Sequence, residues 1–339
     1  MAKKSGVSSA AVSLALNNKK GVSEDTRKRI LKVAEEIGYI PNDTAKSLST
    51  KKSTNIVLYM SALDYEYFHG SFNFDILKYI SSELTSYSYR TVVQMSTLDR
   101  DAEAIYNLAK SEAIGAFVFM GTRLSAEFIK DLVGDIPCIF FNKPQAYGNK
   151  SYSVSFDNRK ATCLLTEHVI EMGHKDIAFV GYLPGVVTAE NRLLGYKDAH
   201  KKYNIEINNE RVIHSEHLPR FGYSVVQDMI EKKERLPSSF VCGNDRIAVG
   251  VMEVLLEYGF SIPDDVSVCG IDNAQLTDML KVPLTTVDIH TEKIGAAIAK
   301  ILIGIFNGNV EKEHIMIDVE IVKRESTGKF NRNRKYVYE

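Results

Sequence analysis

The stretch Lys3-Lys-Ser-Gly-Val-Ser-Ser-Ala-Ala-Val-Ser-Leu-Ala-Leu-Asn17 decides the fold at the start of this chain. Gly6 can supply a tight turn because glycine adopts positive φ at little cost, and Ser8 is a favoured N-cap. The helix predicted after Ser8 has one apolar face, formed by Val12, Ala15 and Leu16, and it ends at Asn17 and Asn18. The exposed positions of its first turns are Ser9, Ala10 and Ser13.

A second helical pattern follows at once. Ser23 is another N-cap, and the acidic pair Glu24 and Asp25 lies in the first turn, where the helix dipole favours acids. Apolar residues then recur at helical spacing before Gly38, a favoured C-cap: Ile30, Leu31, Ala34 and Ile37. Residues 1–40 therefore fit a helix-turn-helix head, whose second helix enters the major groove. Other small helical bundles share this pattern.

The segment after this head is polar and basic, as a linker is. Pro41 biases Ile40 away from a helix. Asn42 can cap a short helix that contains Ala45 and Leu48. We therefore expect residues 41–54 to form a hinge helix and linker.

The net charge of −1 conceals two oppositely charged parts. Residues 1–55 hold 11 Lys+Arg and 5 Asp+Glu, a net charge of +6. The remainder holds 31 Lys+Arg and 38 Asp+Glu, a net charge of −7. A basic head on an acidic body predicts an arm that binds a polyanion. A basic surface that is merely solvated is the alternative that charge alone leaves open.

From residue 55 onward, strand-like and helix-like stretches alternate. This alternation predicts parallel sheets covered on both faces. Eight strands are too many for one small sheet, so we expect two doubly wound lobes within residues 55–339, dividing near 150–160, with a ligand between them. The apolar runs are 55–60, 91–95, 116–120, 137–141, 177–181, 212–214, 240–242 and 266–270. The amphipathic stretches are 74–88, 101–112, 125–133, 159–172, 190–203, 223–234, 246–258 and 291–307.

Several blocks resemble the lactose/galactose repressor (LacI/GalR) family of transcriptional regulators, in family order and over nearly the whole chain. In the head they are Gly6-Val-Ser-Ser-Ala-Ala-Val-Ser-Leu-Ala-Leu-Asn17, Val22-Ser-Glu-Asp-Thr-Arg27, Glu35-Glu-Ile-Gly-Tyr-Ile-Pro-Asn42 and Ala45-Lys-Ser-Leu48. In the body they are Asn191-Arg-Leu-Leu-Gly-Tyr196, Val241-Cys-Gly-Asn-Asp-Arg-Ile-Ala-Val-Gly250, Val266-Ser-Val-Cys-Gly-Ile-Asp272, Pro283-Leu-Thr-Thr-Val287 and Val322-Lys-Arg-Glu-Ser-Thr-Gly328. The resemblance implies an α/β protein with a small all-α helix-turn-helix head and two lobes like those of periplasmic sugar-binding proteins, with a C-terminal strand that crosses back.

The same resemblance implies a DNA-binding set. Ser9, Ala10 and Leu14 would face base edges, and Leu48 would wedge into the minor groove, where an apolar side chain can unstack a base step. The remaining members hold phosphate, position the reading helix or build the hinge helix: Ser8, Ser13, Asn17, Tyr39, Asn42 and Ala45.

The effector set comes from the resemblance as well. Arg192, Asn244 and Asp272 would hold ligand hydroxyls, because buried charged hydrogen bonds discriminate hydroxyl groups strongly. Phe72, Asn142 and His217 align more loosely with the lining of the site. Three alternatives stay open: a turn-capping aspartate for Asp272, a surface ion pair for Arg192 and an ordinary loop histidine for His217.

The chain also departs from the family pattern. The family's first helix begins several residues before the point where Met1 falls, so we expect either a truncated head or a misassigned start of the chain. Leu14 stands where many relatives have arginine, and it can touch a thymine methyl but cannot bond guanine. Ala11 replaces a common threonine, and residues 61–73 contain aromatics that would stack on a sugar or merely pack.

The sequence contains no phosphate-binding glycine loop, metalloprotease motif or nucleophile elbow. Its histidines lack ligand spacing, and Asp264 and Asp265 follow Pro263 in a turn, so we expect no enzyme, no cofactor and no metal. Cys138, Cys163, Cys242 and Cys269 form no C-x-x-C pair, which fits buried thiols in a reducing cytoplasm.

These observations together predict a repressor that binds palindromic operator DNA. We expect it to be a cytoplasmic homodimer, with a tetramer as the alternative. A mono- or disaccharide effector is expected to release the DNA, and a co-repressor that acts in the opposite direction is the alternative. The competing interpretation is a soluble sugar-binding or enzymatic two-lobed protein with an unused helical head.

Overall fold

The structure is a computed structural model. The chain forms two compact units, Met1–Thr54 and Asn55–Glu339. It describes residues 1–16, 20–38, 55–62, 72–87, 89–97, 100–111, 114–122, 124–143, 151–215, 219–310 and 314–333.

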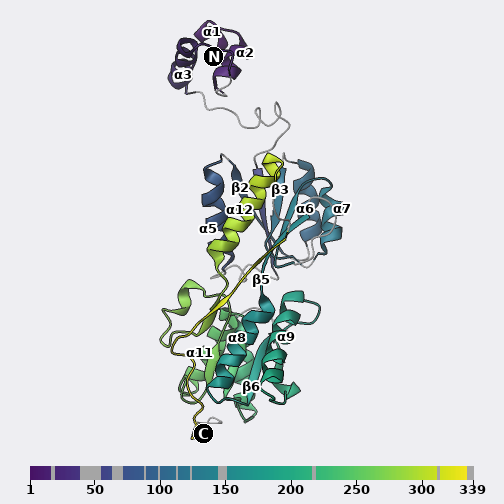
Figure 1. The fold of residues 1–339 in the computed structure, drawn as a ribbon, viewed down its shortest axis with the longest axis vertical. Coiled ribbons are helices and arrows are strands. Elements are labelled where there is room, and N and C mark those ends of the chain that lie inside the picture. Colours follow the sequence, from purple (N-terminus) through teal and green to yellow (C-terminus); the bar gives the residue numbers. More distant parts are fainter. Residues whose placement is uncertain are drawn as a thin grey trace. The chain divides into compact units, whose positions relative to one another are not determined.

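The described residues of the first unit form three helices (Figure 1): α1 (Ala2–Ser5), α2 (Ser9–Leu16) and α3 (Glu24–Glu36). The predicted turn and caps are confirmed. Gly6 has φ 65°, the Ser8 hydroxyl accepts the Ala11 N–H at 3.2 Å, and the Ser23 hydroxyl accepts the Thr26 N–H at 3.4 Å. These contacts fix where α2 and α3 begin.

The core of this unit is small and joins α2 to α3. Val12, Ala15 and Ile30 form its centre, and Ala34 is also buried. The prediction that Leu31 shares this face is wrong, because 47% of that residue is exposed. Ile30 and Ala34 lie one helical turn apart and define the buried side of α3, and Leu31 is rotated away from it.

The N-terminal lobe of the second unit is a six-stranded parallel sheet in the order β11-β5-β4-β3-β1-β2. Its strands are β1 (Asn55–Ala62), β2 (Arg90–Thr97), β3 (Ile114–Phe119), β4 (Cys138–Phe141), β5 (Ser151–Phe156) and β11 (His314–Ile317). Helices α5 (Asn73–Thr85) and α12 (Thr291–Asn307) cover one face, and α6 (Asp101–Ser111) and α7 (Ala126–Val133) cover the other (Figure 1).

The C-terminal lobe repeats this plan with a four-stranded parallel sheet in the order β7-β6-β8-β9. Its strands are β6 (Ile177–Tyr182), β7 (Val212–His214), β8 (Ser239–Cys242) and β9 (Ser267–Cys269). Helices α8 (Asn158–Glu171) and α9 (Val187–Lys202) pack on one face, and α10 (Pro219–Glu231) and α11 (Asp245–Glu257) pack on the other. Two 3-10 turns, Asn209–Arg211 and Gln275–Thr277, complete the lobe.

The chain passes between the lobes at three places: from β5 to α8, from β10 (Thr286–Asp288) to α12, and from β11 to β12 (Glu320–Val322). Strands β10 and β12 pair antiparallel at this crossover. The C-terminal strands appear yellow in Figure 1, running along the core. Beyond β12 the chain rejoins the C-terminal lobe, where the Val268 N–H donates to the Ser326 carbonyl at 2.8 Å.

The predicted fold class, a helical head followed by two doubly wound parallel-sheet lobes, is confirmed. All eight predicted runs are strands, but β5, β10, β11 and β12 were missed. In β5 the residues alternate serine with larger side chains, yet all six are buried, so the run looks too polar for a core strand. No described helix has both the length and the apolar character needed to cross a bilayer.

Candidate DNA-binding head and effector site

The exposed side of α2 carries the predicted DNA-reading residues of the head. Ser8, Ser9, Ala10 and Ser13 are exposed. Leu14 is only half-exposed: a Cβ at Gly21 would lie 3.3 Å from its Cδ1, so the side chain leans toward the turn before α3. The predicted residues Asn17, Tyr39, Asn42, Ala45 and Leu48 lie outside the described residues.

Arg27 of α3 holds the end of α2, a role that the sequence reading missed. Its Nη1 donates to the Ala15 carbonyl at 2.9 Å, and its Nε lies 3.9 Å from the Glu24 carboxylate. Because α2 makes its other contacts through a small core, this bond helps to set the direction in which α2 presents its exposed side. The sequence signal was only a basic residue within the Val-Ser-Glu-Asp-Thr-Arg block.

The described part of the head has an exposed cationic surface. Such a surface supplies the sequence-independent attraction to phosphate that precedes base reading. The exposed basic residues are Lys3, Lys4, Lys20, Lys28, Arg29 and Lys32.

In the second unit, Arg192 lies on α9 and is only 5% exposed. Its Nε donates to Asn158 Oδ1 at 2.9 Å, its Nη1 donates to the Gly243 carbonyl, and its guanidinium lies 5.8 Å from the centre of the Phe156 ring. The surface ion pair considered for Arg192 is therefore wrong. The guanidinium instead connects the start of α8 with the loop after β8.

Asp272 follows β9 and is the most strained residue of the set. It is 5% exposed, its φ is 133°, and its Oδ1 is buried without a hydrogen-bond partner in the described part of the chain. Burial and the nearby Asp245 carboxylate hold the pKa of Asp272 well above its usual range, and Arg192 opposes this rise. Its backbone N–H donates to the Val287 carbonyl at 3.1 Å, but its carboxylate caps no described turn.

Asn244 and Asp245 lie side by side where β8 ends. The Asn244 side chain caps α11 by accepting the Ile247 N–H at 2.8 Å, a structural role that was not predicted. Asp245 accepts the Thr286 hydroxyl at 2.6 Å and the Ala274 N–H at 3.0 Å. Burial raises the pKa of Asp245 to about 6, and these hydrogen bonds oppose the rise. Asp245 thus fixes the loop that carries Asp272.

The N-terminal lobe contributes an amide and an aromatic ring. Asn142 follows β4 with φ 55°, and its Oδ1 lies 3.4 Å from the Asn158 side-chain nitrogen. Through Asn158 it is therefore linked to Arg192. Phe72 immediately precedes α5 and packs edge-on against Phe141, with ring centres 5.9 Å apart. His217 lies outside the described residues.

The structure thus connects Asn142, Asn158 and Arg192 by hydrogen bonds and places Asp272 within electrostatic reach of Arg192. These residues come from the ends of strands and the starts of helices, where parallel sheets bind ligands. Asn158 and Asp245 were not predicted. The Asn-Asp pair directly after a buried strand was the available signal for Asp245.

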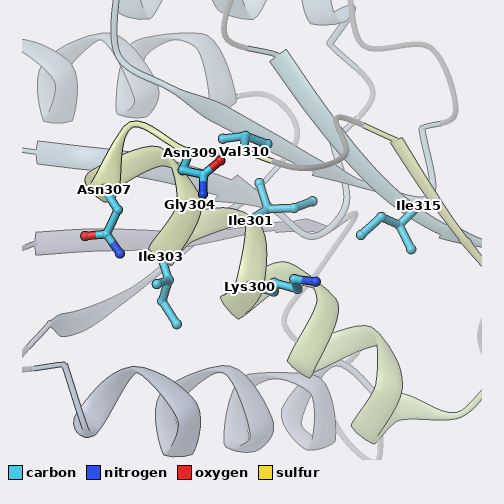
Figure 2. Close-up of a pocket in the computed structure, with 8 residues that line it drawn as sticks. All are labelled: Lys300, Ile301, Ile303, Gly304, Asn307, Asn309, Val310 and Ile315. Atoms are coloured by element: carbon cyan, nitrogen blue, oxygen red, sulfur yellow. The ribbon is translucent and has the colours of Figure 1, made fainter.

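A cavity of about 460 Å³ lies elsewhere, between the end of α12 and β11 (Figure 2). None of the described effector candidates lines it. Its walls are mainly apolar, and they are formed by Lys300, Ile301, Ile303, Gly304, Asn307, Asn309, Val310 and Ile315.

Two family models match the chain. Residues 1–42 match the lacI family of bacterial regulatory proteins, and residues 166–327 match the periplasmic binding protein-like domain. Catabolite control protein A of Priestia megaterium is 26% identical over 331 residues, covering 96% of this chain and 98% of that protein. The HTH-type transcriptional repressor PurR of Pectobacterium atrosepticum is 26% identical over 338 residues, covering 96% of this chain and 95% of that protein.

Solved structures share the fold. The lac repressor dimer bound to operator and the anti-inducer ONPF has a TM-score of 0.83 at 24% identity, covering 96% of this chain and 97% of that one. The complex of the transcriptional regulator CelR with cellobiose has a TM-score of 0.73 at 22% identity, covering 96% and 98%. With its head matching one family model, its core the other, and relatives aligned end to end, the chain joins a LacI-family regulatory head to a periplasmic binding protein-like domain.

Proposed function

We propose that this protein is a transcriptional repressor that binds a palindromic operator through α2 and releases it when a small polyhydroxylated effector, a mono- or disaccharide, binds between the two lobes. The LacI-family head and the relatives named as repressors support the regulatory role. The observation that carries the effector site is the buried Asp272 carboxylate, whose Oδ1 has no hydrogen-bond partner among the described residues although Arg192 lies near.

The chemistry of this site fits hydroxyl groups. A buried carboxylate accepts two hydroxyl donors, and an amide or guanidinium beside it donates to the same ring oxygens. Burying such a carboxylate without a partner costs free energy, so a ligand that supplies the missing bonds gains affinity. The Phe72 ring, which is only partly buried, adds an apolar face of the kind on which sugars pack.

Thermal-shift screening of the whole protein against mono- and disaccharides tests the effector class. A bound sugar raises the melting temperature by mass action. We expect Asp272→Asn and Arg192→Met to abolish the shift, and the surface control Asp198→Asn to retain it. If no sugar shifts the wild-type protein while a nucleobase or an amino acid does, the sugar assignment is wrong although the repressor role stands.

DNA binding is tested by fluorescence anisotropy with candidate palindromes. We expect the affinity to fall steeply with salt, because the basic head displaces counterions from phosphate, and to fall again when the sugar is added. The competing function, an enzyme or a plain sugar-binding protein, predicts no specific operator binding. Turnover of the bound sugar would favour an enzyme.

Two further parts of the proposal concern assembly and location. A homodimer would place two heads on the two half-sites of a palindrome, and a tetramer is the alternative. Exposed apolar residues on β2, on α5 and just after α5 support self-association: Phe74, Tyr87, Val92 and Val93. The buried free thiols Cys138, Cys242 and Cys269 fit the cytoplasm, where an operator-binding protein must work.

A further inference from the structure

A histidine at the crossover between the lobes is surrounded by carboxylates. His290 immediately precedes α12, and only 12% of its side chain is exposed. Its Nδ1 lies 3.6 Å from the Asp288 carboxylate and 3.5 Å from that of Glu292, and its Nε2 lies 3.8 Å from that of Glu320. Both ring nitrogens therefore face anionic oxygens.

The fold fixes these side chains on three segments. Asp288 ends β10 and is the cross-strand partner of Glu320, which begins β12. Asp288 Oδ1 accepts the His290 N–H at 2.7 Å, which leaves Oδ2 turned toward the imidazole. The cluster therefore arises from strand pairing between distant segments, which explains why histidine spacing in the sequence indicated no metal site.

Among the described residues, no lysine or arginine forms an ion pair with the carboxylates of the cluster. In the described part of the chain, the ion pairs of Asp288, Glu292 and Glu320 all run to His290. Asp318, two residues before Glu320, is paired with Lys160 at 2.5 Å. One imidazole among three carboxylates is a donor set that favours a divalent cation.

We propose that Asp288, His290 and Glu320 form a binding site for a divalent transition-metal ion, with zinc as the best match. One ligand atom from each residue lies within 4.8 Å of the others. A tetrahedral zinc ion with bonds of about 2.0–2.2 Å requires ligand atoms about 3.3–3.6 Å apart. Glu320 has 67% of its side chain exposed, so it can rotate inward to close this gap.

Glu292 completes the site without acting as a ligand. When Nε2 of His290 coordinates the ion, the Nδ1 proton faces the carboxylates of Glu292 and Asp288, at 3.5 and 3.6 Å. Metal-binding histidines usually donate their second nitrogen to a carboxylate in this way, which fixes the ring. The preference for an imidazole with oxygen ligands favours zinc, nickel or cobalt over magnesium and calcium.

The ion would connect the end of β10, the start of α12 and the start of β12. Asp288 also forms a backbone bridge with Asp272 of the effector site, so the metal site and the effector site share one stretch of backbone. A bound ion would therefore stiffen the crossover that joins the two lobes. The metal site does not depend on the proposed operator or effector, and its test uses neither.

Isothermal titration of the tag-free, chelator-treated full chain with Zn²⁺ tests the site. We expect one ion per chain and a raised melting temperature in the metal-loaded protein. His290→Asn should abolish both effects and should still fold, because asparagine tolerates the left-handed backbone at this position, where φ is 55°. Glu320→Gln should weaken binding at least about tenfold.

Two controls separate this site from others. His214→Asn removes an exposed histidine on β7, and Cys163→Ser removes the only thiol of the four that is not fully buried. Both variants should bind zinc as the wild type does. The proposal is overturned if the wild type binds no zinc, if His290→Asn binds it undiminished, or if Cys163→Ser loses it.

Discussion

At the scale of single residues, Asp272 and Asp245 predict how stability depends on pH. Burial raises the pKa of both carboxyl groups, to about 6 for Asp245. A raised pKa in the folded state means that the folded chain holds protons that the unfolded chain releases above about pH 4. The stability contributed by these protonated groups is therefore present below about pH 4 and is lost as the pH rises through the folded pKa values.

We expect Asp272→Asn to reduce this loss, because it removes a buried acid whose Oδ1 lacks a described partner. At pH 7.5 and without effector, its free energy of unfolding should exceed that of the wild type by about 1–2 kcal/mol. Urea denaturation between pH 4.5 and 7.5 measures the difference in the free energy of unfolding between the two proteins and the slope of that free energy against pH. Asp198→Asn is the control, since Arg159 lowers the pKa of Asp198 by a hydrogen bond at the surface. Equal slopes in wild type and Asp272→Asn would contradict this account.

The residue scale also shows what sequence alone can and cannot predict. The caps at Ser8 and Ser23 were predictable because they depend on neighbours three residues away. The bonds of Arg192 to Asn158 and Gly243 were not, because they join segments that only the tertiary fold brings together. Without the family resemblance, nothing in the sequence distinguishes Arg192 from any other basic residue on a helix.

At the scale of elements, the bond from Arg27 to the Ala15 carbonyl predicts the order of α2. We expect Arg27→Ala to destabilise the head by about 1.5–3 kcal/mol, the usual effect of losing a charged hydrogen bond. Arg29→Ala removes the same charge from an exposed position and should change stability by less than about 0.5 kcal/mol. Hydrogen exchange of the α2 amides measures the effect. Equal exchange in the two variants would show that the bond to Ala15 does not hold α2.

The contact between α8 and α9 depends on Gly195. A Cβ at this position would lie 2.0 Å from the Arg159 carbonyl oxygen, so the two backbones would have to separate. Alanine gains about 1 kcal/mol of helix propensity over glycine, but overpacking of this kind costs about 1–3 kcal/mol. We therefore expect Gly195→Ala to lower the free energy of unfolding, as measured by chemical denaturation.

Lys197→Ala is the matched control for this contact, because Lys197 is exposed on the same helix. It should change the free energy of unfolding by less than about 0.5 kcal/mol. A Gly195→Ala variant that is as stable as the wild type would mean that α8 and α9 are not held as closely as the structure places them.

Element order was largely predictable, and the exceptions have physical causes. Alternating apolar runs and amphipathic stretches identified the two lobes because buried parallel strands are continuously apolar. Strand β5 escaped because Ser151, Ser153 and Ser155 occupy buried positions. Strands β10 and β12 are three residues each and exist through their mutual pairing, so neither has a pattern long enough to recognise.

At the scale of the whole molecule, the effector-binding unit leaves an apolar surface at the edge of a sheet. Strand β2 is the last strand of the six-stranded sheet, and Val93 on it is 45% exposed. Tyr87 and Phe74 nearby in sequence, on or just after α5, are 53% and 45% exposed. A long edge strand with apolar side chains pairs readily with another copy unless something covers it. We therefore expect this surface to form part of the homodimer interface.

Val93→Lys should weaken self-association at least tenfold. A lysine at an apolar interface must either lose its hydration or leave a gap between the subunits. A loss of about 1.4 kcal/mol of binding free energy suffices for a tenfold change in the dissociation constant. Val187→Lys is the matched control, since Val187 is 52% exposed on α9 in the other lobe. Sedimentation equilibrium gives the mass of each species, so it also separates a dimer from a tetramer. A monomeric wild type, or a Val93→Lys variant that sediments as the wild type does, would refute the interface. Because a monomer presents one head to one half-site, operator affinity should fall together with dimerisation in Val93→Lys, although the residue lies outside the DNA-binding unit.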